Sequence, residues 1–131
     1  MAERLRARPA AYAGLTLVLS AAAWLTARAA GAPPGPMAAG LGLAWTLQVL
    51  GFARLAGALA SGGAVAGAWV GGMAVRFAGL AALWLASVVV GGTVRVTALA
   101  YAFSLVGFLL IEAGWLAVAA RPARQTDEGR G

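Results

Sequence analysis

Four long apolar segments constrain the fold of this chain more than any other feature of its sequence. Each approaches the roughly 20 residues that an α-helix needs to cross a lipid bilayer. Short breaks rich in glycine, proline or polar residues separate the segments, which is typical of turns. The segments cover residues 10–27, 37–53, 64–90 and 96–120. The sequence therefore predicts an all-α, polytopic membrane protein whose four transmembrane helices form an antiparallel bundle.

The composition favours lipid as the solvent of this chain. Of the 131 residues, 62% are hydrophobic and 11% are charged, whereas a soluble protein has about 45–50% apolar and about 25% charged residues. A fold of this size would expose large apolar patches in water. The absence of cysteine and histidine excludes disulfides, thiolate chemistry and the commonest metal ligands.

The arginines lie at the ends of the apolar segments and predict the orientation of the chain. No lysine is present, so arginine alone supplies the basic side chains behind the net charge of +6. The flanks on one side of the membrane hold Arg28 and Arg95, and those on the other side hold seven arginines. Cytoplasmic flanks are the basic ones, so we expect both termini in the cytoplasm. The seven are Arg4, Arg6, Arg8, Arg54, Arg121, Arg124 and Arg130.

The two ends of the chain are expected to lie outside the membrane. Residues 1–9 are predicted to be a basic cytoplasmic N-terminus, and the polar residues 121–131 a disordered cytoplasmic tail. The first apolar segment has an alternative, because it and the AGA at residues 30–32 also resemble a secretory signal with its cleavage site. The segment is long enough to span, and three more follow, so we favour a retained helix over cleavage.

Two charged residues, Arg76 and Glu112, lie inside the third and fourth apolar segments. The position midway between them is residue 94, in the turn that joins these segments. They should lie at the same depth, because each helix rises about 1.5 Å per residue. A charge near the middle of a membrane helix costs about 2.5–3.5 kcal/mol, and such residues usually face the interior and pair. The sequence therefore predicts an intramembrane ion pair between Arg76 and Glu112.

Further polar residues share the helix faces on which these charges lie. At about 100° per residue, Tyr101 and Ser104 fall on the side of the acid, and Ser87 falls on the side of the arginine. Gln48 matches the arginine in depth across the break at residues 61–63. We predict a polar layer made of these four residues, with hydrogen bonding of Gln48 to its own helix or to water as the alternative.

The ion pair has two interpretations. In the first it is structural and locks the third and fourth helices together. In the second Glu112 exchanges protons or ions, or meets the charge of a partner, because intramembrane acids are often functional. A matched arginine occupies the carboxylate, so we favour the structural interpretation and keep the second as an alternative.

Three glycines at four-residue spacing, Gly63, Gly67 and Gly71, open the third segment. Small residues at this spacing let two helix backbones approach closely. They lie roughly opposite Arg76 around the helix. We expect them to pack against the second helix of the same chain; a second copy of the chain, giving a homo-oligomer, or a foreign subunit is the alternative.

The sequence carries no catalytic motif. It has no Walker loop, no Ser–His–Asp set and no cluster of metal ligands, and its adjacent carboxylates, Asp127 and Glu128, lie in the polar tail without an apolar scaffold. Arginines at segment ends, without interleaved aromatic residues, favour a lipid bilayer over nucleic acid as the partner. We therefore expect a protein that is not an enzyme and has no cofactor and no metal.

The whole-chain plan and the stretch GGMAVRFAGLAALWL at residues 71–85 resemble the ATP synthase protein I family. These are small four-helix membrane proteins of bacteria that are associated with the F-type ATP synthase. Arg76 stands where the family tends to carry lysine or arginine near the start of its third helix. The resemblance implies a bacterial inner-membrane protein that helps to assemble or stabilise the rotor ring of the synthase; magnesium supply has also been proposed for the family.

Two functional hypotheses follow. The first is a non-enzymatic accessory or assembly subunit of a membrane complex, with the ATP synthase membrane subunits as its partners. The second is a small ion- or proton-coupled transporter or channel that uses Glu112 as its coupling site. A regulatory or structural membrane module without transport remains a third.

Overall fold

Four long helices make up the part of the chain that the computed structural model describes, residues 2–119. Helix α1 covers Ala2–Ala29, α2 covers Pro34–Ser61, α3 covers Val65–Val90 and α4 covers Gly92–Ala119. The predicted tail at residues 121–131 lies outside the described residues.

All four helices contain a stretch that is long and apolar enough to cross a membrane. The candidate spans are Pro9–Ala29, Pro34–Ser61, Val65–Val90 and Gly92–Trp115. Large apolar side chains point away from the other helices, and Val89, Phe103 and Leu110 are 85%, 78% and 70% exposed. Such an apolar surface suits lipid and not water. The prediction of an all-α, multi-pass membrane protein is confirmed at this level.

The helices extend beyond the predicted apolar segments. Helix α1 begins at Ala2, so the basic residues before Pro9 continue the helix. Helix α2 passes the exposed Arg54 and ends eight residues after the predicted end at residue 53. An arginine favours helix as well as most residues do, and its long side chain can reach water while its backbone stays in the helix. Hydropathy therefore marks where lipid ends and not where the helix ends.

Glycines terminate the first two helices. Gly31 has a φ of +87° after α1, and Gly62 has a φ of +67° after α2. The N–H of Gly62 donates to the carbonyl of Ala58, which satisfies an acceptor at the end of the helix. Other L-residues rarely adopt this conformation, so the two turns fall where the sequence supplies glycine.

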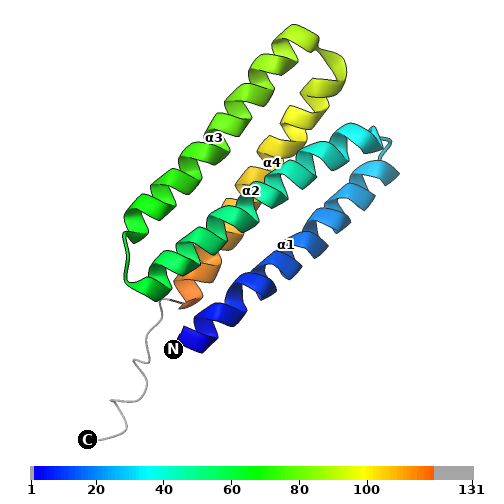
Figure 1. Cartoon of the computed structure of the whole chain (residues 1–131). Coiled ribbons are helices and arrows are strands. Elements are labelled where there is room, and N and C mark those ends of the chain that lie inside the picture. Colours follow the sequence, from blue (N-terminus) through cyan, green and yellow to red (C-terminus); the bar gives the residue numbers. More distant parts are fainter. Residues whose placement is uncertain (1, 120–131) are drawn as a thin grey trace, which may run out of the picture.

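Helices α2 and α4 form the centre of the molecule and share its largest interface. Helix α1 packs on α2 from one side, and α3 contacts both α2 and α4 from the other (Figure 1). The start of α1, the end of α4 and the α2–α3 connection lie at one end of the molecule. This end is called the terminal end below, and the end with the α1–α2 and α3–α4 turns is called the turn end.

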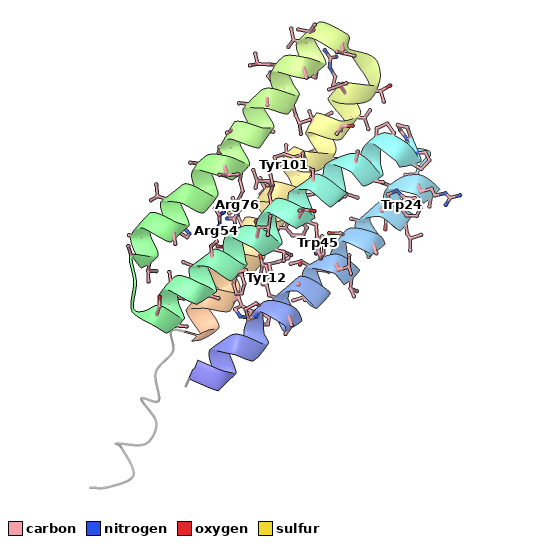
Figure 2. The ribbon with its side chains drawn as sticks, viewed as in Figure 1. Tyr12, Trp24, Trp45, Arg54, Arg76 and Tyr101 are labelled. Atoms are coloured by element: carbon pink, nitrogen blue, oxygen red, sulfur yellow. The ribbon has the colours of Figure 1, made fainter. Side chains whose placement is uncertain are left out.

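Two tryptophans attach α1 to α2 (Figure 2). The indole N–H of Trp24 donates to the carbonyl of Pro34 at 3.1 Å, and that of Trp45 donates to the carbonyl of Ala13 at 3.3 Å. The hydrogen bonds join the helices near the turn end and again further along α1. Helix α1 is thereby fixed in register on α2.

A glycine allows the close approach of α2 and α4. A Cβ atom on Gly40 would lie 2.5 Å from the carbonyl oxygen of Thr97 and 2.8 Å from the Cβ of Ala100. Both distances are far below van der Waals contact, and both atoms belong to or adjoin the α4 backbone. Without a hydrophobic effect inside lipid, such close backbone packing is a main source of helix association.

We predict that Gly40→Ala destabilises the protein by about 1–3 kcal/mol, because the added methyl group forces α2 and α4 apart. The measurement is the free energy of unfolding in mixed micelles titrated with SDS. The matched control is Gly42→Ala, two residues away on α2, where an added Cβ meets no described atom within 4 Å. The control should be neutral or slightly stabilising, since alanine favours helix over glycine. Equal effects of the two substitutions would contradict the close approach.

Candidate functional site: a buried polar cluster shared by four helices

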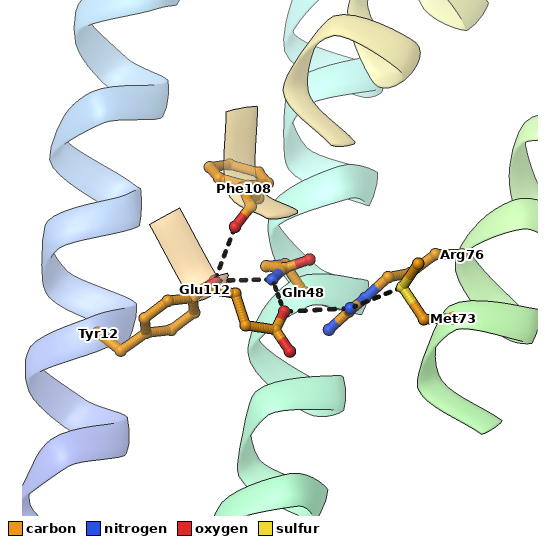
Figure 3. Close-up of polar contacts among 6 residues, drawn as sticks. All are labelled: Tyr12, Gln48, Met73, Arg76, Phe108 and Glu112. Carbon is orange, nitrogen blue, oxygen red and sulfur yellow. Dashed lines mark hydrogen bonds and ion pairs between the residues drawn. The ribbon is translucent and has the colours of Figure 1, made fainter. Parts of the chain in front are cut away.

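Each of the four helices contributes one polar side chain to a single buried cluster (Figure 3). The four are Tyr12 of α1, Gln48 of α2, Arg76 of α3 and Glu112 of α4. Their exposed fractions are 0%, 0%, 2% and 3%. Side chains of this kind are rarely so buried unless they bind one another. The name polar cluster is used for these four residues below.

An ion pair lies at the centre of the polar cluster. The Nη1 atom of Arg76 is 3.1 Å from Oε2 of Glu112. The same carboxylate oxygen accepts a hydrogen bond from the amide Nε2 of Gln48. The structure therefore brings together the two charged residues that the sequence places at one depth, and it adds Gln48 from a third helix. One carboxylate oxygen joins α2, α3 and α4.

Tyr12 extends the polar cluster to the remaining helix. Gln48 Nε2 donates to the Tyr12 hydroxyl oxygen at 2.7 Å, and that hydroxyl lies 3.5 Å from the carbonyl oxygen of Phe108, to which it donates. The second distance is at the long limit for a hydrogen bond, so the contact with Gln48 is the stronger one. A continuous polar path thus runs from Arg76 through Glu112 and Gln48 to Tyr12 (Figure 3).

Two glycines leave space around Arg76, one for its guanidinium group and one for the Tyr101 hydroxyl that binds its backbone. A Cβ on Gly51 would collide with the guanidinium group, so the arginine side chain packs directly against α2 at this glycine. The Tyr101 hydroxyl donates to the backbone carbonyl of Arg76 at 2.8 Å. A Cβ on Gly79 would lie 2.9 Å from that hydroxyl oxygen. Figure 2 shows Arg76 and Tyr101 near each other beside α3.

Aromatic rings cover the polar cluster on the side of the terminal end. The ring of Tyr12 stacks on that of Phe52, with centroids 4.0 Å apart and an interplanar angle of 10°. Trp115 meets the Tyr12 ring edge-on at 5.9 Å and 81°. Phe52 and Trp115 each lie about one helical turn beyond the polar residue of their own helix, Gln48 and Glu112. The rings of Phe52 and Trp115 thus pack around the Tyr12 end of the polar cluster.

The polar cluster lies inside the apolar part of the helices but not at its centre. Exposed arginines mark both boundaries: Arg54 towards the terminal end, and Arg28 and Arg95 towards the turn end. Gln48 precedes Arg54 by six residues, about 9 Å of helix, and Tyr12 precedes Arg28 by 16 residues, about 24 Å. The sum is close to the roughly 30 Å hydrocarbon core of a bilayer. The ion pair therefore lies about a quarter of the way in from the terminal end.

The predicted polar layer is only partly present. Gln48 joins the ion pair, and Tyr101 binds the backbone of Arg76. Ser87 and Ser104 instead donate to carbonyls of their own helices, those of Trp84 and Ala100, both at 2.7 Å. A serine hydroxyl inside a helix is close enough to the preceding turn to satisfy itself there, so a shared face does not predict a contact between helices for this residue.

The predicted glycine ladder makes no close contact with the body of α2 among the described residues. Around Gly71 no described atom lies within 4 Å of an added Cβ, and the atoms within 4 Å of an added Cβ on Gly63 or Gly67 belong to Ala58, Ser61 and Ala64, a few residues away in the chain. Helix α3 turns the opposite face, with Arg76, towards α2 and α4. The guanidinium must reach Glu112, and this requirement fixes the rotation of α3.

Tyr12 and Gly51 are parts of the site that the sequence patterns above do not include. Tyr12 lies three residues after the start of its apolar span, where a tyrosine is usually an interfacial anchor. The rule that pairs Arg76 with Glu112, equal distance from the turn between two helices, also pairs Tyr12 with Gln48. The position midway between those two residues is Ala30, beside the first turn. Gly51 has no sequence signal of its own, since its role depends on where the arginine side chain lies.

Two buried polar atoms of the cluster have no hydrogen-bond partner among the described residues. They are the amide oxygen Oε1 of Gln48 and the Nε of Arg76. One is an acceptor and the other a donor, so the polar cluster has unused hydrogen-bonding capacity next to its ion pair.

Comparison of the chain with protein-family models, with curated proteins and with solved structures gives no match. The functional interpretation therefore depends on the geometry of the polar cluster and on the sequence.

We predict that Arg76 and Glu112 are energetically coupled. In Glu112→Gln or Arg76→Met the remaining partner is left buried without its counter-charge, so each variant should lose about 3 kcal/mol of unfolding free energy. The double variant leaves no unpaired charge and should lose less than the sum of the two, by about 1–3 kcal/mol. Unfolding in SDS-containing micelles measures all four proteins of this cycle. Strict additivity would mean that the two side chains do not interact.

Proposed function

We propose that the protein is a non-enzymatic accessory or assembly subunit of a membrane complex. The observation that carries this proposal is the occupancy of Glu112, whose Oε2 accepts from both Arg76 and Gln48 while the side chain is 3% exposed. In a transport site, a proton or ion must reach the acid from one side of the membrane and leave it towards the other. A buried acid that is held by two neighbours suits a fixed framework better.

The proposed setting is the bacterial inner membrane, with the helices as an antiparallel bundle and both termini in the cytoplasm. The excess of arginine on the flanks at the terminal end supports this orientation. The lipid bilayer is the first partner, because apolar side chains cover the outer surface of the spans.

The complex that we propose is the F-type ATP synthase, and the proposed task is to help its rotor ring assemble or stay together. Support comes from the resemblance of the four-helix plan and of GGMAVRFAGLAALWL, with Arg76 at its centre, to the ATP synthase protein I family. Arg76 would then be the basic residue that orders the accessory protein itself, since its charge is directed inwards to Glu112.

The outer face of α3 is where we propose that the partner packs. Helix α3 is the least covered of the four spans. Gly67 and Gly71 in its first half, and Gly63 in the connection just before it, would let a partner helix approach closely. A second copy of the chain is the other occupant, and the experiment below distinguishes the two.

A second function, an ion- or proton-coupled conduit, is favoured by one observation. Gln48 Oε1 and Arg76 Nε, which have no hydrogen-bond partner in the described part of the chain, could bind a passing water or ion next to Glu112. If Glu112 were the coupling site, Glu112→Gln would abolish a proton-linked flux in proteoliposomes at unchanged fold. We predict no change in proton flux between the wild type and this variant, measured with a pH-sensitive dye inside the vesicles. Loss of a flux in the variant would replace the accessory role by transport.

The accessory role predicts co-purification with the membrane subunits of the ATP synthase from native membranes in mild detergent. The substitution Gly71→Leu should reduce recovery of the rotor-ring subunit by about tenfold, because leucine blocks close helix approach. The control is Gly114→Leu on α4, where an added Cβ also meets no described atom within 4 Å. Equal recovery of the ring with both variants would contradict the α3 face. Absence of any synthase subunit, together with dimers in the wild type, would assign the face to a second copy.

A further inference from the structure

We propose that a groove between α1, α2 and α4 binds one acyl chain of a phospholipid. The groove has a volume of about 530 Å³ and lies on the side of α2 and α4 that α1 borders. It is separate from the outer face of α3, and the proposal does not depend on the accessory role. Its walls include Ser20 of α1, Leu41 of α2, and Leu99, Phe103, Ser104 and Gly107 of α4.

The dimensions of the groove select an acyl chain over a helix. Its lining on α4 runs from Val96 to Ile111, which is about 22 Å along the helix axis. A volume of about 530 Å³ spread over this length describes a long and narrow groove. A hydrocarbon chain, whose atoms contact their neighbours at about 3.5–4 Å, fills such a channel. A partner helix is about 10–12 Å across and does not fit.

The chemistry of the walls also selects hydrocarbon. The hydroxyls of Ser20 and Ser104 donate to the carbonyls of Thr16 and Ala100 at 2.8 and 2.7 Å. Their hydrogens are therefore used within their own helices, and the remaining lining is apolar. A polar ligand would lose its hydrogen bonds to water here and find no partners in the groove. An apolar chain has no such hydrogen bonds to lose. Phe108 and Ile111 line the end of the groove next to the polar cluster, and neither Arg76 nor Glu112 is part of its lining.

The position of the groove identifies the leaflet that supplies the lipid. Val96 is at the turn end, directly after the exposed Arg95. The groove runs inwards from there and is longer than the roughly 15 Å that one leaflet contributes to the hydrocarbon core. A full acyl chain from this leaflet can therefore lie within it. Its phosphate would be at the level of Arg95, whose positive charge complements it.

The test is native mass spectrometry of the full-length protein released from vesicles of phosphatidylethanolamine and phosphatidylglycerol. We expect the wild type to retain one phospholipid per chain after detergent washing. Gly107→Leu fills the groove, since an added Cβ at Gly107 meets no described atom within 4 Å. It should lower the occupancy by about tenfold. Gly114→Leu on the same helix, outside the lining, should leave occupancy unchanged.

A second variant from the opposite wall, Ala23→Leu of α1, keeps the test decisive if Gly107→Leu does not fold, as judged by thermal unfolding. Loss of lipid in Ala23→Leu with a normal melting temperature supports the groove. A wild type that releases all lipid while still folded overturns the proposal. So does equal retention by the wild type and the folded groove variants, which would mean that the retained lipid is bound elsewhere on the apolar surface.

Discussion

The ion pair between Arg76 and Glu112 within an apolar four-helix chain is the interaction on which the rest of the structure depends. In hydrocarbon neither charge has water to solvate it, so each requires the other. Their contact fixes the rotation of α3 against α4, and the shared hydrogen bond from Gln48 brings α2 to the same oxygen. Tyr12 then attaches α1 through Gln48. Four helices that would otherwise slide past one another in lipid thus acquire a common depth.

Glycines complement this polar cluster by setting how closely the helices approach. Gly51 makes space for the arginine and Gly79 for the Tyr101 hydroxyl that binds its backbone, while Gly40 brings α2 onto α4. Because Arg76 and Glu112 point inwards, the described surface of the spans is largely apolar. It offers packing faces to lipid and to protein. This arrangement is the basis on which we propose an accessory role, in which the protein acts through its packing faces.

Much of this architecture follows from the sequence because the membrane limits the choices. Length and hydropathy predict four spanning helices, and equal rise along two antiparallel neighbours predicts that Arg76 and Glu112 meet. The same argument would reach Tyr12. The sequence does not reveal which glycines lie where two helices touch. A regular four-residue spacing marks Gly63, Gly67 and Gly71. The close contacts between helices are instead at Gly40 and Gly51. Serines are ambiguous for another reason, since Ser87 and Ser104 can bond their own helices.

The contact of the two charges in a bilayer can be measured by solid-state NMR. With Glu3→Gln and Glu128→Gln, Glu112 is the chain's single glutamate, so its carboxyl carbon can be labelled with ¹³C and the arginine guanidinium groups with ¹⁵N. The account predicts strong ¹³C–¹⁵N dipolar dephasing in lipid bilayers, as an Nη1–Oε2 separation of 3.1 Å requires, and loss of this dephasing in Arg76→Met. Absence of dephasing in the parent protein, or its persistence without Arg76, would contradict the account.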